Sequence, residues 1–151
     1  MPIWDQLKNK TQTLTEQLNT KKDQLRSREF ADASMAMCAL VAAADGSVDA
    51  RERQKTAALI TSNDVLAVFA PDELRGKFDA YCDKLNRDFD FGKVEAIASI
   101  SKLKSKPDQA RAVVSIGLII GGADGQFDAD ERRVVKDACY AVGIEPSEFD
   151  L

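Results

Sequence analysis

A ten-residue segment occurs twice in this chain. The sequence ADGSVDARER at positions 44–53 returns as ADGQFDADER at positions 123–132. The two copies share an Asp, a Gly, a second Asp, a Glu and an Arg at the same spacing, which indicates that one supersecondary unit has been used twice. This repeat constrains the fold, because each copy must occupy an equivalent place in two similar halves.

Helical patterns surround both copies. Helices are expected at about 28–44 and 50–61 around the first copy, and at about 108–123 and 129–142 around the second. Sustained period-two alternation and Asn-Gly hairpin signals, which would indicate strands, are missing from the sequence. Each copy is therefore predicted to be the loop of a helical hairpin.

The remaining helical signals complete the predicted architecture. A helix should begin at Pro71, another should run near 94–103, and a short turn should lie at 146–149. Small residues end the first helix of each hairpin, at 42–44 and 121–123, and would let the two backbones come close together. The predicted fold class is all-α: a compact bundle of six to seven helices, built from two hairpins related by a pseudo-twofold axis.

Residues 1–26 are expected to form an amphipathic arm ahead of a helical domain at 27–151. Its apolar residues have spacings compatible with a heptad stripe, whereas its threonines lower the helix propensity; the stripe is Trp4, Leu7, Leu14, Leu18 and Leu25. Two interpretations stay open. The arm is a helix packed on the core, or Trp4 and the neighbouring lysines contact an anionic membrane or a partner helix.

Composition excludes several classes of function. Residues 27–151 carry 16 Lys or Arg against 22 Asp or Glu, so the expected folded part is acidic, which argues against a nucleic-acid binder. The chain has no histidine, the commonest general base and transition-metal ligand. Its three cysteines, Cys38, Cys82 and Cys139, lie in apolar helical patterns and are expected to be buried thiols in a reducing cytoplasm.

Much of the repeated motif fits helix capping. Asp49 and Glu52 are three residues apart at an expected helix start, as are Asp128 and Glu131. This is the spacing of a capping box, in which a side chain and a backbone N–H exchange hydrogen bonds at the helix start. Each cap would stabilise the helix by about 1 kcal/mol. From the residues alone, this interpretation is favoured over a metal site.

Asp45 and Asp124 need a different explanation, because an anion beside the negative end of a finished helix is unfavourable. Either the recurring Arg53 and Arg132 compensate it, or a bound cation does. Carboxylates suit a hard cation of the Ca²⁺ or Mg²⁺ class, and the absence of nearby His and Cys argues against zinc or copper. The candidate metal ligands are Asp45, Asp49, Glu52, Asp124, Asp128, Asp130 and Glu131.

The two loops differ in charge. The second has Asp130 where the first has Arg51, so the second loop is more negative by two charges. A divalent ion is therefore expected to bind there first.

The helical pattern, the acidic balance and the repeated D-G-x-Φ-D-x-x-E motif, where Φ is Val or Phe, resemble the TerB family of tellurite-resistance proteins. The resemblance covers essentially the whole chain and extends more weakly to the TerB-like domain of certain membrane-attached DnaJ-type co-chaperones. It implies a helical fold of two related halves, acidic metal-linked loops, and work in the cytoplasm beside the membrane with an integral membrane partner. With this resemblance, divalent-ion binding becomes favoured over capping alone.

Three classes of function follow as hypotheses. The leading one is a non-catalytic adaptor whose acidic loops bind a divalent cation and tune docking to other tellurite-resistance proteins. The second is a metal-independent helical interaction module of the kind attached to DnaJ-type co-chaperones. The third, an acid–base enzyme, is disfavoured because no cleft or sugar-stacking aromatic is indicated. Direct capture of tellurite is not expected, because carboxylates repel an oxyanion.

Overall fold

We describe the protein from a computed structural model, in which residues 12–17, 25–123 and 125–151 are described. This part of the chain is all-helical, as predicted. Residues 12–17 are helical, and the main elements follow in the order α2 (Arg28–Ala42), α3 (Ala50–Ser62), η2 (Leu66–Val68), α4 (Pro71–Arg87), α5 (Phe89–Ser101), α6 (Pro107–Gly121), α7 (Ala129–Val142) and η3 (Pro146–Phe149).

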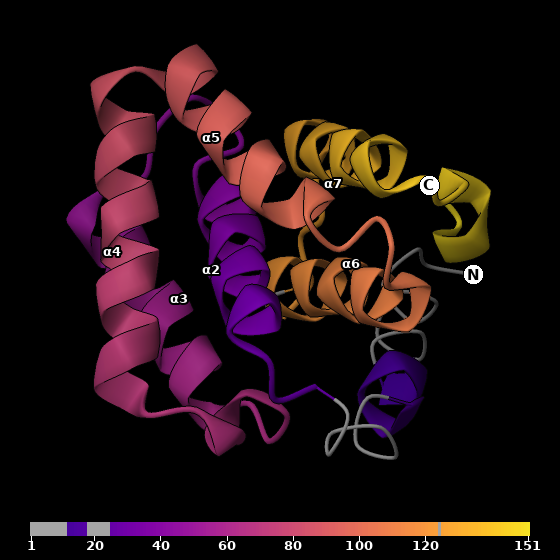
Figure 1. Cartoon of the computed structure of the whole chain (residues 1–151). Coiled ribbons are helices and arrows are strands. Elements are labelled where there is room, and N and C mark those ends of the chain that lie inside the picture. Colours follow the sequence, from indigo (N-terminus) through magenta and orange to yellow (C-terminus); the bar gives the residue numbers. More distant parts are fainter. Residues whose placement is uncertain (1–11, 18–24, 124) are drawn as a thin grey trace.

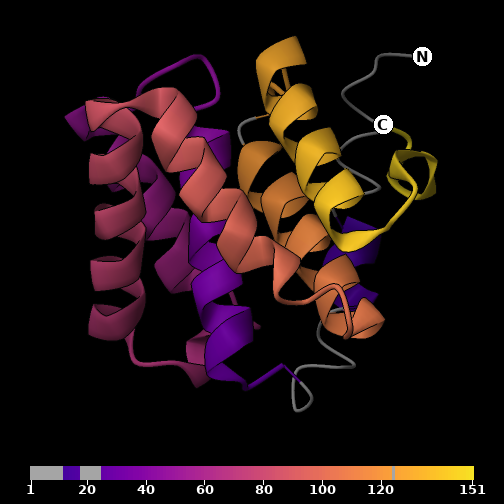
Figure 2. The same cartoon turned by 45° about the horizontal axis from the view of Figure 1, so that its top comes forward.

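Helix α2 is the centre of the bundle. Its residues from Phe30 to Val41 are almost all apolar or small, and nearly all of them are buried. A helix that is apolar on every side must be covered on every side. Figure 1 shows α4 on one side of α2 and α6 with α7 on the other, and α2 contacts each of them. Figure 2 shows α5 crossing from α4 toward α7, both of which it contacts.

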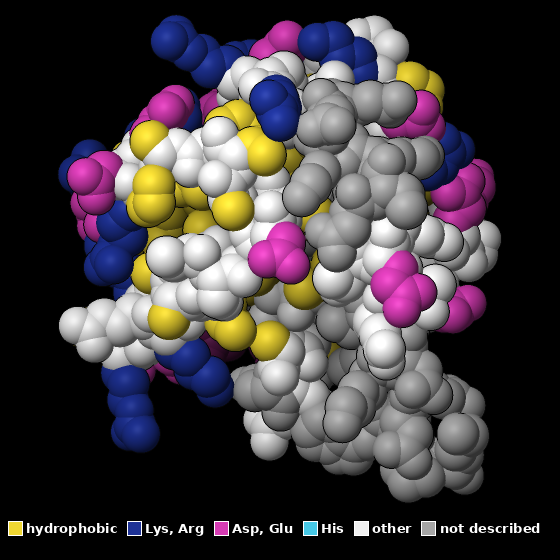
Figure 3. Space-filling view, turned by 90° about the horizontal axis from the view of Figure 1, so that it is seen from below, with side chains coloured by type: hydrophobic (Ala, Val, Ile, Leu, Met, Phe, Trp, Pro, Cys, Tyr) yellow, Lys and Arg dark blue, Asp and Glu magenta, His cyan; other side chains and the backbone are white. Residues whose placement is uncertain are grey.

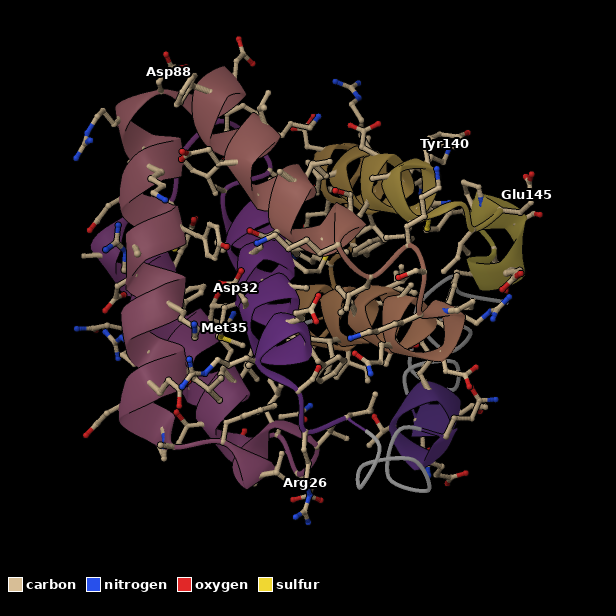
Figure 4. All side chains as sticks on the ribbon, in the orientation of Figure 1. Arg26, Asp32, Met35, Asp88, Tyr140 and Glu145 are labelled. Atoms are coloured by element: carbon tan, nitrogen blue, oxygen red, sulfur yellow. The ribbon has the colours of Figure 1, made fainter. Side chains whose placement is uncertain are left out.

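One polar cluster joins α2 to its neighbours. Asp32 and Met35 lie on the side of α2 that faces α4 (Figure 4). The Tyr81 hydroxyl donates to Asp32 Oδ2 at 3.0 Å and also hydrogen-bonds to Ser99 on α5. The Asp32 carboxylate therefore has a hydrogen-bond partner on α4, where the helices pack together.

The contacts between helices agree with two hairpins that pack on each other in a reciprocal way. α2 packs against α6, while α3 contacts α6 and α7 contacts α2. The first helix of each hairpin is largely buried, and the second presents one buried face. This reciprocal arrangement is the one expected from a duplicated unit.

The first part of the connection between the halves, from η2 to the start of α4, lies on the underside of the molecule. There η2 and the start of α4 pack on α3 around a hollow of about 20 Å³, which Phe69 and Leu74 help to line. Hydrophobic side chains gather on this underside, bordered by Lys and Arg (Figure 3). Phe69 also stacks on Phe30 with 6.4 Å between ring centroids, which ties the connection to α2.

Several predicted boundaries were wrong. Helix α5 begins at Phe89 rather than near 94, because Asp88 Oδ1 accepts the Phe91 N–H at 3.2 Å and caps the helix earlier. Helices α2 and α6 end at Ala42 and Gly121 rather than at 44 and 123, and a turn precedes each acidic loop. In the predicted arm, Leu14 and Leu25 are buried, whereas Trp4, Leu7 and Leu18 lie outside the described residues.

Candidate functional site

Both copies of the motif form the loop of a helical hairpin, as predicted. The first loop joins α2 to α3, and the second joins α6 to α7. Gly46 and Gly125 both have positive φ, at 117° and 79°, which only glycine adopts freely. The Gly46 N–H donates to Ala43 O at 2.8 Å, and the Gly125 N–H donates to Gly122 O at 2.9 Å. The two turns are thus closed in the same way.

The predicted caps are present at both helix starts. Asp49 Oδ1 accepts the Glu52 N–H, and Asp128 Oδ1 accepts the Glu131 N–H, each at 2.8 Å. In the second copy Glu131 Oε1 also accepts the Asp128 N–H at 3.4 Å, which completes a capping box. In the first copy the Asp49 carboxylate caps Glu52 in the same way, and the Asp49 backbone N–H acts in turn on the Glu52 carboxylate.

The two loops meet at one cleft of about 290 Å³. Asp45 and Glu52 of the first copy line this cleft, and so do Asp128 and Glu131 of the second copy. The sequence predicted these carboxylates in the loops of two hairpins, and the fold gathers them around one shared cleft. Asp49 and Asp130 do not line the cleft, and Asp124 lies outside the described residues.

Close packing of α2 on α6 brings the loops together. At Gly121, a Cβ atom would lie 2.7 Å from Val41 Cγ1 and 3.2 Å from Glu131 Oε2. The missing side chain lets the ends of α2 and α6 meet and leaves room for the Glu131 carboxylate beside them. Val41 and Gly121 both line the cleft, together with Ile120.

The carboxylates of the first loop repel one another. Partial burial of Glu52 raises its pKa most, and the negative charges of Asp49 and Asp45 raise that pKa further. The backbone N–H bond at Asp49 and the charge of Lys55 act in the opposite direction. Crowded carboxylates of this kind are stabilised by any cation that reaches them.

Lys55 is a cleft residue that sequence analysis missed. It lines the cleft three residues after Glu52, on the same face of α3. The signal was the 52, 55, 56, 59 spacing, and Glu52, Lys55, Thr56 and Leu59 all line the cleft. The matching position in the second copy is the buried Val134, so only one hairpin supplies this ammonium group.

Arg53 does not pair with Asp45 in the described contacts, and Asp124, the matching residue of the second copy, lies outside the described residues. Arg53 Nη1 lies 2.9 Å from Asp83 Oδ1 and 3.8 Å from Asp79 Oδ1 on α4. Arg132 Nη1 donates to the Asp150 carbonyl at 3.4 Å. Arg53 therefore fastens α3 to α4 and does not compensate Asp45, which accepts the Ser47 N–H at 3.5 Å.

Asn86 is a second residue that the sequence did not single out. Its Oδ1 accepts the Val48 N–H at 2.8 Å, and its Nδ2 donates to the Val48 carbonyl at 2.9 Å. This pair of bonds fixes the first loop to α4. The second loop has no equivalent bond among the described residues, since α4 lies beside α3 and not beside α7.

The oxygen ligands of the cleft are of the type that a hard cation prefers, but their positions in this structure do not form a coordination site. Carboxylate oxygens are the ligands that Ca²⁺ and Mg²⁺ prefer. Yet the described residues contain no group of three or more His, Cys, Asp or Glu side chains positioned to hold a metal. The cleft carboxylates would have to move toward one another to coordinate an ion.

The three cysteines are buried free thiols, as predicted. Burial raises the pKa of the Cys38 thiol strongly, that of Cys82 to about 12 and that of Cys139 to about 11. A thiol reacts as its thiolate, so these side chains are poorly suited to react with tellurium compounds.

No helix in the described parts of the chain is long and apolar enough to cross a membrane. The family model for the tellurite resistance protein TerB matches residues 31–151. The chain is also similar to the tellurium resistance protein TerB of an Alcaligenes species, with 26% identity over 118 residues, which cover 78% of this chain and 97% of that relative. No solved structure gives a significant match.

Proposed function

This chain belongs to the TerB family of tellurite resistance proteins, and from that premise we propose that it is a non-catalytic adaptor in tellurite resistance. Its acidic cleft binds a divalent cation of the Ca²⁺ or Mg²⁺ class and so tunes docking to other tellurite-resistance proteins. One of these partners is an integral membrane protein, which the adaptor meets at the cytoplasmic face of the membrane. The observation that carries this proposal is the meeting of both acidic loops at one cleft.

The charge of the cleft supports an indirect role in resistance. Four carboxylates and one lysine line it, which leaves three net negative charges at neutral pH. Tellurite is an oxyanion, so this surface repels it. The buried cysteines offer no exposed thiolate for tellurium chemistry. Resistance then arises from what the protein assembles with, and not from capture of tellurite.

Ion binding would act on the geometry of the two hairpins. Glu52 stands at the start of α3, and Asp128 and Glu131 stand at the start of α7. Drawing these carboxylates together moves the two helix starts toward each other, which changes the surface presented to a partner. The second loop is more negative, so its carboxylates should dominate the affinity.

A calorimetric titration with Ca²⁺, Mg²⁺ and Mn²⁺ tests the cation half of the proposal. The variant D124N/D128N removes two charges, while asparagine remains a good helix cap. We expect binding heat with the wild type and at least tenfold weaker binding with the variant. Absence of binding heat in the wild type, in a correctly folded sample, would remove cation binding from the function.

The alternative is a metal-independent interaction module. The hydrogen bonds at Asp49 and Asp128 favour it, because helix capping accounts for those two side chains without any ion. Capping does not account for Asp45, which lines the cleft with Glu52 and whose negative charge helps to raise the Glu52 pKa. For that reason the cation-binding adaptor is the better-supported function.

A further inference from the structure

The cleft has two kinds of wall, and a metal ion accounts for only one of them. The carboxylates described above form one wall. The other is apolar and comes from the ends of α2 and α6 and from α3; its members are Val41, Ala42, Ala44, Leu59, Ile120 and Gly121. These side chains offer no oxygen to a cation. A cleft of about 290 Å³ is also far larger than one ion requires.

An apolar floor beside an acidic wall fits a long basic side chain. Arginine and lysine lay their methylene stems on apolar surface while the charged head stays among polar groups. Arginine is the better match, because its planar guanidinium can bond to carboxylates on two sides at once. Here Glu52 on α3 and Glu131 on α7 supply carboxylates from two different helices.

The protein already places one basic side chain in this cleft. Lys55 lines it from α3, and its positive charge acts on Glu52. After this lysine is counted, three net negative charges remain in the lining. This net negative charge is complementary to a second cationic group from outside.

We propose that the cleft is a docking site for an arginine-bearing segment of a partner protein. The arginine stem lies on Val41, Leu59 and Ile120, and its guanidinium bonds to the carboxylates of both loops. Because a divalent ion would use the same carboxylates, the ion and the partner compete. This competition rests on the proposed function, whereas docking itself requires no ion.

The test uses a defined probe, the acetylated and amidated peptide Ala-Leu-Arg-Ala-Leu-Arg-Ala-Leu carrying a fluorophore. Its control replaces both arginines by citrulline, which keeps the shape and removes the charge. Binding to the full chain is measured by fluorescence anisotropy, and NMR amide shifts locate the contact. We expect the arginine peptide to shift amides of both acidic loops, and the citrulline peptide to bind at least tenfold more weakly.

Three variants separate specific docking from general attraction. E131Q and E52Q should each weaken the arginine peptide about tenfold, the size of a lost charge-assisted hydrogen bond. E145Q is the matched control. It removes the same charge from Glu145, an exposed residue beyond the end of α7 that is labelled at the right of Figure 4, and it should change the affinity less than twofold. L59Q tests the apolar floor and should weaken binding several-fold, although it removes no charge. Circular dichroism confirms that each variant is folded.

The outcomes distinguish this proposal from cation binding. Peptide binding that Ca²⁺ displaces supports both. Peptide binding in a protein that binds no ion supports docking and overturns the proposed cation. Equal binding of the arginine and citrulline peptides, equal effects of E131Q and E145Q, or no peptide binding by a protein that binds Ca²⁺ would each overturn the docking site.

Discussion

At the residue scale, Asp128 shows how one side chain serves both the helix and the cleft. Its Oδ1 accepts the Glu131 N–H at 2.8 Å, and the residue also lines the cleft. A capping carboxylate has further lone pairs, so the two roles do not exclude each other. Capping needs an acceptor atom, whereas attraction of a cation needs a charge. Substitutions can therefore separate the two roles.

We predict that D128A and D128N differ in stability but agree in ion binding. D128A removes the cap and should lower the free energy of unfolding by about 1 kcal/mol. D128N keeps an acceptor and should cost a few tenths of that value, while both variants lose affinity for Ca²⁺. Urea unfolding and calorimetry measure the two quantities. Equal destabilisation by both variants, or unchanged ion affinity in D128N, would contradict the division of roles.

Glu52 gives a prediction about pH. Its pKa is raised in the folded protein by burial and by Asp49 and Asp45, so its ionised form is less favourable there than in the unfolded chain. The folded state then holds its proton to higher pH, and stability falls as pH rises through that pKa. E52Q removes this cost and should raise the melting temperature at pH 7. The gain should shrink on acidification toward pH 4.5; a gain that grows instead would refute this account.

At the element scale, the close approach of α2 and α6 creates the cleft. Both helices are apolar along most of their length, and Gly121 lets their ends meet beside Glu131. The outer helices α3 and α7 then bring their acidic N-terminal turns to the same opening. The position of the cleft is thus decided by the packing of two core helices.

Alanine at two helical glycines should have opposite effects. In G121A the new Cβ would press on Val41 at 2.7 Å, and we expect a loss of about 1–3 kcal/mol of stability together with altered ion or peptide affinity. In G76A the Cβ meets nothing within 4 Å on the exposed side of α4, and helix propensity should add up to about 1 kcal/mol. Thermal unfolding measures both. Stabilisation by G121A would show that α2 and α6 can separate freely.

Local signals allowed most elements to be predicted. The bounds of α7 agree with the expectation, because Asp128 caps one end and the left-handed Gly143 closes the other. Pro107 marks the start of α6 for a similar local reason. The start of α5 was missed because its cap, Asp88, follows directly on α4, so no loop separates the two helices. Boundaries without a loop leave little trace in a sequence.

At the scale of the whole molecule, the duplicated motif makes one site and not two. The sequence revealed which carboxylates recur, but their meeting at a shared cleft depends on how the hairpins pack, which no local spacing encodes. The same packing brings Lys55 into the cleft from one hairpin only, because Val134 takes the matching place in the other. The halves share the same order of helix, loop and helix, and they differ in charge.

The most direct test of this account is an NMR titration of the full chain with CaCl₂ that follows the Gly46 and Gly125 amides, one in each loop. Because the loops share a cleft, both amides should shift with one midpoint, and E131Q should move that midpoint at both positions, more strongly than E52Q does. E145Q, beyond the end of α7, should leave it unchanged. Two independent midpoints, or a response to E131Q confined to Gly125, would contradict the shared site.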